Sequence, residues 1–365
     1  MAAATMIGLL DALAGYSDPL VWLSILAFLA GAVLEVTDRR SLAVPVAAGG
    51  WVLFGVFWLS MFPYFFLEFG SPLEGVLSLA ALPLSLYAAY LLLTGRDQLL
   101  ILSRAIACMG LLYLPVMTIE PVRAWLIETV AVQSAWGMDL LGYSIPIETG
   151  PNGYESRFDF SAYTEPGDTY STYIVLACTG IGSISIFGGL IASVRAPLRR
   201  KLLGFAVATG VIYMLNIGRN VFVGIAAPMN WFDTPTTEWI AVAVAGEGTR
   251  TSFFVSHHLI SQSLSVVALV AITLLVVRVV PEVLEPLEEV LFVLTNREYD
   301  LDAALGASSV PAGAADADAS DPGRPATDGG GDGGTPRDVD GTALDDGRSS
   351  ASGSSDSTTT DGGRS

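Results

Sequence analysis

The chain has 365 residues, of which 52% are hydrophobic and 15% are charged. Soluble domains carry about 25% charged residues, so this composition, with a mean hydropathy of +0.55, indicates a membrane protein. Its 36 acidic residues outnumber its 18 lysines and arginines, and the formal charge of −18 argues against nucleic acid or anionic lipid as a partner. Every basic residue except Lys201 is an arginine, and this bias together with the acidity is typical of proteins adapted to high salt.

About seven apolar stretches are long enough to cross a bilayer. A hydrocarbon core roughly 30 Å thick requires a helix of about 20 residues. Stretches of this kind lie at 19–36, 41–62, 71–94, 99–119, 172–194, 202–226 and 252–280. They are too continuously apolar for the alternating strands of a membrane barrel. We therefore predict an all-α, polytopic bundle of about seven transmembrane helices.

Positively charged residues follow every second predicted span. They are Arg39, Arg40, Arg96, Arg195, Arg199, Arg200, Lys201 and Arg278. Because such residues favour the cytoplasmic side, this side is expected to carry these loops and the C-terminus. The N-terminus and the segments 63–70, 120–171 and 227–251 are then expected outside.

Four segments lie outside the predicted spans. Residues 120–145 mix tryptophan with charged residues and predict an interfacial helix, whereas 146–168, rich in Gly, Pro and acidic residues, predicts an exposed outer loop. Residues 281–305 are amphipathic, and 306–365 have too few apolar residues to fold. We divide the chain into a transmembrane domain (1–280), an amphipathic cytoplasmic segment (281–305) and an acidic disordered tail (306–365).

Polar residues inside the last three spans are the candidates for chemistry, because a charged side chain costs about 2.5–3.5 kcal/mol at the centre of a spanning helix. Counting 1.5 Å per residue from the outer ends places Cys178, Arg219 and His258 roughly 10 Å below the outer surface. Asn216, Asn220, His257 and Gln262 are supporting candidates. His257 shares a helix face with Ser261 and His258 with Gln262, so only one of the two pairs is expected to face the site.

A thiol, a guanidinium and an imidazole at one depth favour nucleophilic acyl transfer. Cys178 is the candidate nucleophile, and activation of its thiol in an apolar setting needs a neighbour such as His258 or Arg219. Gly180 and Gly182 would let another backbone approach closely. Cys108 lies in a plain apolar run and is expected to be a buried small hydrophobe.

Three motifs together resemble the exosortase/archaeosortase family. They are Ala-Cys-Thr-Gly-Ile-Gly-Ser around Cys178, Asn-Ile-Gly-Arg-Asn at 216–220, and His258, and the resemblance covers most of residues 19–280. It implies a membrane-embedded cysteine transpeptidase that cleaves a C-terminal sorting signal bearing a Pro-Gly-Phe motif. It also implies passage through a thioester, protein substrates such as the surface-layer glycoprotein, and a membrane lipid as acceptor, without a cofactor or metal.

The resemblance also implies roles for individual residues. Cys178 corresponds to the nucleophile, Arg219 to a proton donor and the third basic position, His258, to a transition-state stabiliser; some relatives carry arginine there, so Arg250 is a second candidate. Because arginine hardly deprotonates, Arg219 is better suited to hold a thiolate or oxyanion, and His258 is then the better acid/base.

Two other functions fit the same residues. A transporter could use buried Arg, Asn and His as a binding site, although no inverted repeat is evident. A simple intramembrane cysteine protease would differ from a transpeptidase only in the acyl acceptor. A retinal protein is excluded because the last predicted span has no lysine.

Overall fold

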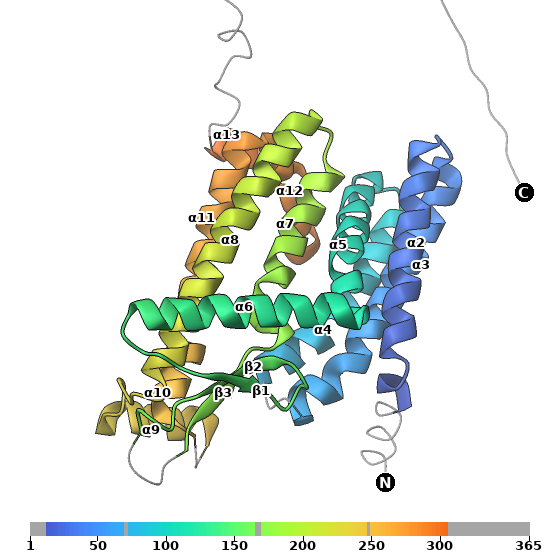
Figure 1. Ribbon diagram of the computed structural model, residues 1–365. Coiled ribbons are helices and arrows are strands. Elements are labelled where there is room, and N and C mark those ends of the chain that lie inside the picture. The colour runs from blue at the N-terminus through green and yellow to red at the C-terminus, as the bar shows by residue number, and fades with distance from the viewer. Residues whose placement is uncertain (1–11, 69–71, 165–168, 247–248, 306–365) are drawn as a thin grey trace, which may run out of the picture. The chain divides into compact units, whose positions relative to one another are not determined.

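The computed structural model describes residues 12–68, 72–164, 169–246 and 249–305, and they form a bundle of helices with a small sheet at one end (Figure 1). The long helices are α2 (Ser17–Val36), α3 (Arg40–Pro63), α4 (Pro72–Leu93), α5 (Leu100–Thr118), α8 (Leu198–Ala226) and α11 (Gln262–Val279). Within the described residues, six helical segments are long and apolar enough to cross a membrane, at 17–36, 40–66, 74–93, 97–118, 198–226 and 251–279. The predicted all-α membrane bundle is confirmed.

The first four spans pack through small residues and aromatic rings. A Cβ on Gly50 would lie 2.9 Å from the ring of Phe28, so only glycine allows α2 and α3 to approach this closely. Phe28 meets Trp51 edge-to-face at 5.4 Å, and Trp51 Nε1 donates a hydrogen bond to Ser103 Oγ of α5 (3.0 Å). The buried indole N–H is thereby satisfied, and α3 is tied to α5.

The structure differs from the sequence prediction at residues 172–194, where a full span was expected. Helix α7 covers only Ile181–Ser193, or about 20 Å of rise, which is shorter than the hydrocarbon core. The preceding residues form a strand and then a 3-10 turn, η3 (Leu176–Thr179). Gly180, at φ +78°, separates this turn from α7. The depth count made for Cys178 along a continuous helix therefore does not apply.

Residues 120–171 form a helix and a sheet. Helix α6 (Glu120–Leu140) is present as predicted and crosses the bundle axis, with Trp125 and Trp136 each 64% exposed (Figure 1). The predicted outer loop contains the antiparallel sheet β1–β2–β3 instead. Its strands are β1 (Ile147–Thr149), β2 (Glu155–Asp159) and β3 (Ser171–Tyr173). These strands have only three to five residues each, which is too short to give a clear alternating pattern in the sequence.

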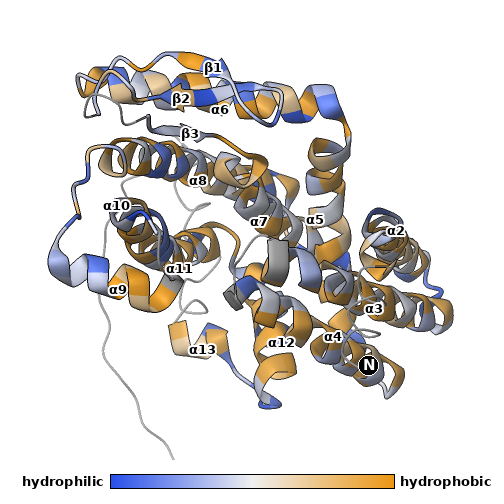
Figure 2. Ribbon diagram, turned by 90° about the horizontal axis from the view of Figure 1, so that it is seen from below, coloured by the Kyte–Doolittle hydropathy of each residue, from blue (hydrophilic) through white to orange (hydrophobic). Residues whose placement is uncertain are grey.

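The sheet is held against α6 by one face of β2 and β3. The inward side chains of Phe158, Tyr170 and Ile174 are buried with Val130 and Met138 of α6. Seen along the bundle axis, β3 lies between the other two strands and the ends of α7 and α8 (Figure 2). The sheet therefore lies with α6 along one side of the bundle, near one of its ends, and leads into the turn that carries Cys178.

The last part of the chain returns through the bundle and ends in short helices. Helix α9 (Pro235–Ala245) precedes α10 (Thr251–Phe253), a π-helix η4 (Phe254–Ser261) and α11. Beyond α11 come η5 (Pro281–Val283), α12 (Leu284–Thr295) and α13 (Leu301–Leu305), so the amphipathic stretch 281–305 is largely helical. The predicted tail, 306–365, lies outside the described residues.

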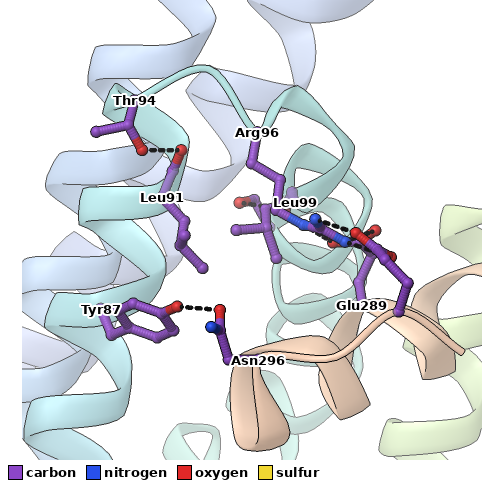
Figure 3. Close-up of polar contacts among 9 residues, drawn as sticks. Tyr87, Leu91, Thr94, Arg96, Leu99, Glu289 and Asn296 are labelled. Atoms are coloured by element: carbon purple, nitrogen blue, oxygen red, sulfur yellow. Dashed lines mark hydrogen bonds and ion pairs between the residues drawn. The ribbon is translucent and has the colours of Figure 1, made fainter.

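An arginine clamp fastens α12 to the loop between α4 and α5 (Figure 3). Arg96 forms ion pairs with Glu289 (2.9 Å) and Glu298 (2.7 Å), and its guanidinium lies 3.3 Å from the ring centre of Phe292. The hydrogen bonds that it donates to Glu298 and Glu289 raise the pKa of Arg96 above its ordinary value. Nearby, Tyr87 of α4 donates a hydrogen bond to Asn296 Oδ1 (2.8 Å). These contacts close the end of the bundle opposite the sheet.

We predict that Arg96→Met lowers the free energy of unfolding by about 3 kcal/mol, because it leaves the carboxylate of Glu289, only 9% exposed, without a partner. The change is measured as a lower Tm of the full chain in detergent. Glu298→Gln is the control, since Glu298 is 73% exposed and its pair with Arg96 is screened by solvent. Equal shifts in Tm for the two variants would contradict the claim that the Arg96–Glu289 pair stabilises the fold.

Candidate functional site

Cys178 lies on the tight η3 turn between β3 and α7. Its backbone N–H donates to the carbonyl of Val175 (2.8 Å), and Thr179 Oγ1 donates to the carbonyl of Leu176 (2.7 Å). The thiol is free and half-buried. The turn is therefore fixed by local hydrogen bonds while the sulfur retains access to a reacting group.

Two asparagines of α8 hold this turn from the other side. Nδ2 of Asn216 and Nδ2 of Asn220 donate to the backbone carbonyl of Cys178 at 2.5 and 2.9 Å. They share a face of α8 because they are four residues apart. A Cβ on Gly180 would lie 3.3 Å from Cγ of Asn216, so glycine is needed both for the left-handed backbone and for the close approach.

Arg219 belongs to the same turn of α8 and contacts His257 of η4. Its Nη2 lies 3.2 Å from His257 Nε2. A guanidinium has only donors, so Nε2 is the acceptor and His257 is neutral, with its proton on Nδ1. Arg219 Nε and His257 Nδ1 are buried without a hydrogen-bond partner among the described residues, and no described carboxylate forms an ion pair with Arg219. Such unsatisfied donors mark a position where a bound group is expected.

The two histidines lie in a π-helical segment that the sequence analysis did not predict. π-helical turns are rare and are frequent at functional sites. His257 is half-buried and stacks on Phe253 at 5.0 Å between ring centres, while the His258 ring lies 4.6 Å from the His257 ring. His257 and Ser261 face the bundle, whereas His258 and Gln262 are exposed. The structure thus brings His257, rather than His258, into contact with Arg219.

The sequence analysis missed Ser252, Asp233 and Tyr170 at this end of the bundle, whereas it named Arg250 as a second candidate for the third basic position. Ser252 Oγ accepts from the N–H of Phe232 (2.9 Å) and donates to Asp233 Oδ1 (2.6 Å), which joins the α8–α9 loop to α10. The guanidinium of Arg250 lies 4.5 Å from the ring centre of Tyr170. Burial raises the pKa of Tyr170, and the charge of Arg250 opposes this rise. These pairings join segments that are far apart in the chain, so no local sequence pattern predicts them.

Glu74, at the start of α4, is a second missed residue. One of its carboxylate oxygens is buried without a hydrogen-bond partner among the described residues. In the sequence, Glu74 is a single acid at the edge of an apolar run, a common place for a solvated charge.

The chemistry available is that of a thiol, amide donors, a guanidinium and two imidazoles. The described residues contain no cluster of three or more His, Cys, Asp or Glu side chains that could hold a metal ion. A thiolate that attacks a carbonyl creates negative charge on sulfur and then on oxygen, and a preorganised guanidinium stabilises both. The arrangement is suited to acyl transfer through a covalent thioester.

Comparison with known proteins finds a family match and similar proteins in two organisms. Residues 16–249 match the family described as transmembrane exosortase. The chain is 44% identical to archaeosortase A of Haloferax volcanii over 300 residues, covering 80% of this chain and 98% of that protein. It is 41% identical to archaeosortase A of Natronomonas pharaonis over 281 residues, covering 76% and 89%. No solved structure matches.

The match to the family contains Cys178, Asn216, Arg219 and Asn220 but ends before η4. The assignment of the histidines to the site therefore rests on the geometry of this chain.

We predict that Gly180→Ala distorts the η3 turn whereas Gly182→Ala does not. Alanine at 180 has to adopt the left-handed region, at a cost of about 1–2 kcal/mol, and it crowds Asn216. Around Gly182 no atom lies within 4 Å of an added Cβ. The check is the rate at which a small iodoacetamide alkylates Cys178 in a Cys108→Ala background. A rate unchanged by Gly180→Ala would show that the turn does not depend on this glycine.

Proposed function

Because the chain belongs to the transmembrane exosortase family, we propose that it is a cysteine transpeptidase acting on exported proteins within the membrane. The proposed substrates carry a C-terminal sorting signal of the Pro-Gly-Phe type, with the surface-layer glycoprotein as a principal one. The proposed acceptor of the cleaved protein is a membrane lipid. The archaeosortase A relatives support a sorting enzyme, and the finer assignments are ours.

One observation carries the proposal: a single turn of α8 carries a cation together with the two side chains that hold the thiol turn. Asn216 and Asn220 bind the Cys178 carbonyl, and Arg219 lies between them in the sequence. Arg219 has no ionic partner among the described carboxylates. In a medium of low dielectric such a charge strongly favours a nearby anion. A thiolate and an oxyanion are the anions that a cysteine transpeptidase forms.

In the proposed first half-reaction, His258 accepts the proton of the Cys178 thiol. The thiolate attacks the carbonyl carbon of the scissile peptide bond, and Arg219 stabilises the oxyanion of the tetrahedral intermediate. The C–N bond then breaks, and His258 returns the proton to the leaving amine. The product is an acyl-thioester on Cys178.

In the second half-reaction a nucleophilic group of the lipid loses its proton to His258 and attacks the thioester. The C–S bond breaks, and His258 gives this proton to the sulfur, which leaves as the thiol. His257, neutral and bound to Arg219 through Nε2, orients the guanidinium and is a positioning residue. Its acceptor nitrogen is occupied, so the exposed His258 is the better proton carrier.

The two competing functions make different demands on the same site. An intramembrane protease would hydrolyse the thioester, with water as the acyl acceptor. A transporter would bind its solute at Arg219 and would not need the thiol. The family match favours the enzyme, and solute uptake that survives Cys178→Ala would support the transporter instead.

The experiment that tests the function follows the C-terminus of the surface-layer glycoprotein in cells by mass spectrometry. We expect wild-type cells to yield a shortened, lipid-linked C-terminus and Cys178→Ser cells an uncleaved one. A shortened end without lipid indicates the protease, and identical C-termini in both strains contradict the transpeptidase.

Three further variants separate the proposed roles. His258→Gln and Arg219→Lys are each expected to lower the rate of thioester formation at least about 100-fold, the usual contribution of an acid/base or an oxyanion donor. His257→Gln is expected to have a smaller effect, since glutamine can still accept from Arg219. Near-normal thioester formation in His258→Gln, with loss in Arg219→Lys, would show that histidine is not the base.

We propose that the sheet end of the bundle faces outside and that α12 and the tail face the cytoplasm, with 1–280 as the transmembrane domain, 281–305 as a cytoplasmic segment and 306–365 as a disordered tail. The loops that follow α2, α7 and α11 lie at the end opposite the sheet (Figure 1). These loops and the helix ends beside them carry Arg39, Arg40, Arg195, Arg199, Arg200, Lys201 and Arg278.

This orientation predicts the pattern of labelling by a membrane-impermeant thiol reagent in intact cells. In a background without Cys108 and Cys178, a cysteine introduced by Glu148→Cys in β1 should react. One introduced by Arg297→Cys after α12 should react only after lysis. Both residues are exposed, so exposure does not distinguish them. The opposite pattern would invert the proposed topology.

A further inference from the structure

The strand that leads to Cys178 is an edge strand with one free side. In the order β1–β2–β3, only β2 pairs with β3. Phe160 N–H donates to the Tyr170 carbonyl and Ile174 N–H to the Ser156 carbonyl, both at 2.9 Å. In an antiparallel ladder, bonded pairs alternate with non-bonded pairs, so the backbone groups of 170, 172 and 174 are directed to β2.

The backbone groups of Ser171 and Tyr173 therefore point away from β2. Both residues are exposed, and no backbone hydrogen bond joins them to another described residue. Their two N–H and two C=O groups offer up to four hydrogen bonds along this edge. Extended chains pair with such edges.

The other edge of the sheet is protected against strand addition, and the β3 edge is not. Pro146 precedes β1, Glu148 places a charge on it, and a bulge interrupts its register between Glu148 and Thr149. Proline, charge and bulges are the usual devices that block edge pairing. β3 consists of Ser, Thr and Tyr and pairs regularly with β2.

The free edge is continuous with the proposed catalytic turn. Cys178 follows Tyr173 by five residues, and Val175 between them is still extended (φ −111°, ψ 169°). A peptide aligned on the edge of β3 would therefore run toward the thiol. Continuity of this kind does not exist for β1, which is separated from Cys178 by both other strands.

We propose that the substrate binds as a fourth strand of this sheet, its extended backbone paired with Ser171 and Tyr173 so that the scissile bond is delivered to Cys178. This inference rests on the proposed function. Recognition through the backbone gives affinity that is independent of most side chains, so different proteins sharing one short signal can use the same edge. Alternate substrate side chains would lie beside Ser171 and Tyr173 on the exposed face of the sheet.

The first test compares proline substitutions on the two edges, using the full chain in detergent and a synthetic sorting-signal peptide. Tyr173→Pro removes one outward N–H without breaking the ladder with β2, and we expect KM for the peptide to rise roughly tenfold with kcat little changed. Tyr173→Ala keeps this N–H and should raise KM less. The rate at which a small iodoacetamide alkylates Cys178 should be the same in the wild type and in both variants. An equal rate would show that the turn is intact.

The matched control is Thr149→Pro on the protected edge. Thr149 is exposed, and Gly150 N–H donates to the carbonyl of Tyr154, just before β2 (2.8 Å). Because bonded and non-bonded positions alternate along the ladder, the N–H of Thr149 points away from β2. The KM of Thr149→Pro for the peptide should equal that of the wild type. Equal KM values for Tyr173→Pro and Tyr173→Ala would overturn strand addition.

A second readout needs no catalysis and so separates this proposal from the proposed function. In Cys178→Ala, a photocrosslinking phenylalanine analogue at position 171 should capture the peptide at every second residue, as expected for a neighbouring strand. Capture without this alternation, or capture of a second copy of the chain instead, would overturn the inference. Processing that survives Cys178→Ala would reject the cysteine mechanism. The crosslinking result would still decide whether the substrate binds at the edge of β3.

Discussion

The site depends on one interaction: the backbone carbonyl of Cys178 is held by two asparagine side chains of α8. Because α7 is too short to span the bilayer, the turn before it cannot satisfy its backbone as a continuous helix does. Asn216 and Asn220 supply the missing donors. The same pair fixes the position of Cys178 relative to Arg219, which lies on the same turn of α8. Gly180 permits the contact by leaving room beside Asn216.

The second constraint is a cation without an ionic partner. Four other described arginines pair with carboxylates, and these pairs include Arg104 with Glu35 at 3.5 Å and Arg200 with Glu282 at 2.5 Å. Among the described residues, Arg219 forms a hydrogen bond only with a neutral imidazole, and its Nε is unsatisfied. A half-buried charge in this state is costly, and we propose that Arg219 is maintained because it stabilises a transient anion. The clamp at Arg96 illustrates the structural alternative, in which two carboxylates and a ring satisfy the guanidinium.

Much of the fold could be predicted because the spans are long and apolar. The prediction of a span at 172–194 was wrong because apolarity alone does not distinguish an extended strand and a turn from a helix. Gly180 was also interpreted as allowing close packing rather than as a left-handed break in the helix. The sheet escaped prediction because its three strands are very short. The motifs containing Cys178 and Arg219 lie on two segments that the structure brings into contact. The choice between His257 and His258 depends on a π-helix that periodicity cannot show.

The most direct test of the central claim is the intact mass of the full chain incubated with a sorting-signal peptide and quenched in acid. The account predicts an adduct equal to the N-terminal fragment of the peptide, located on Cys178, removed by hydroxylamine and absent from Cys178→Ala. Peptide cleavage without any such adduct, or an adduct on another residue, would contradict it.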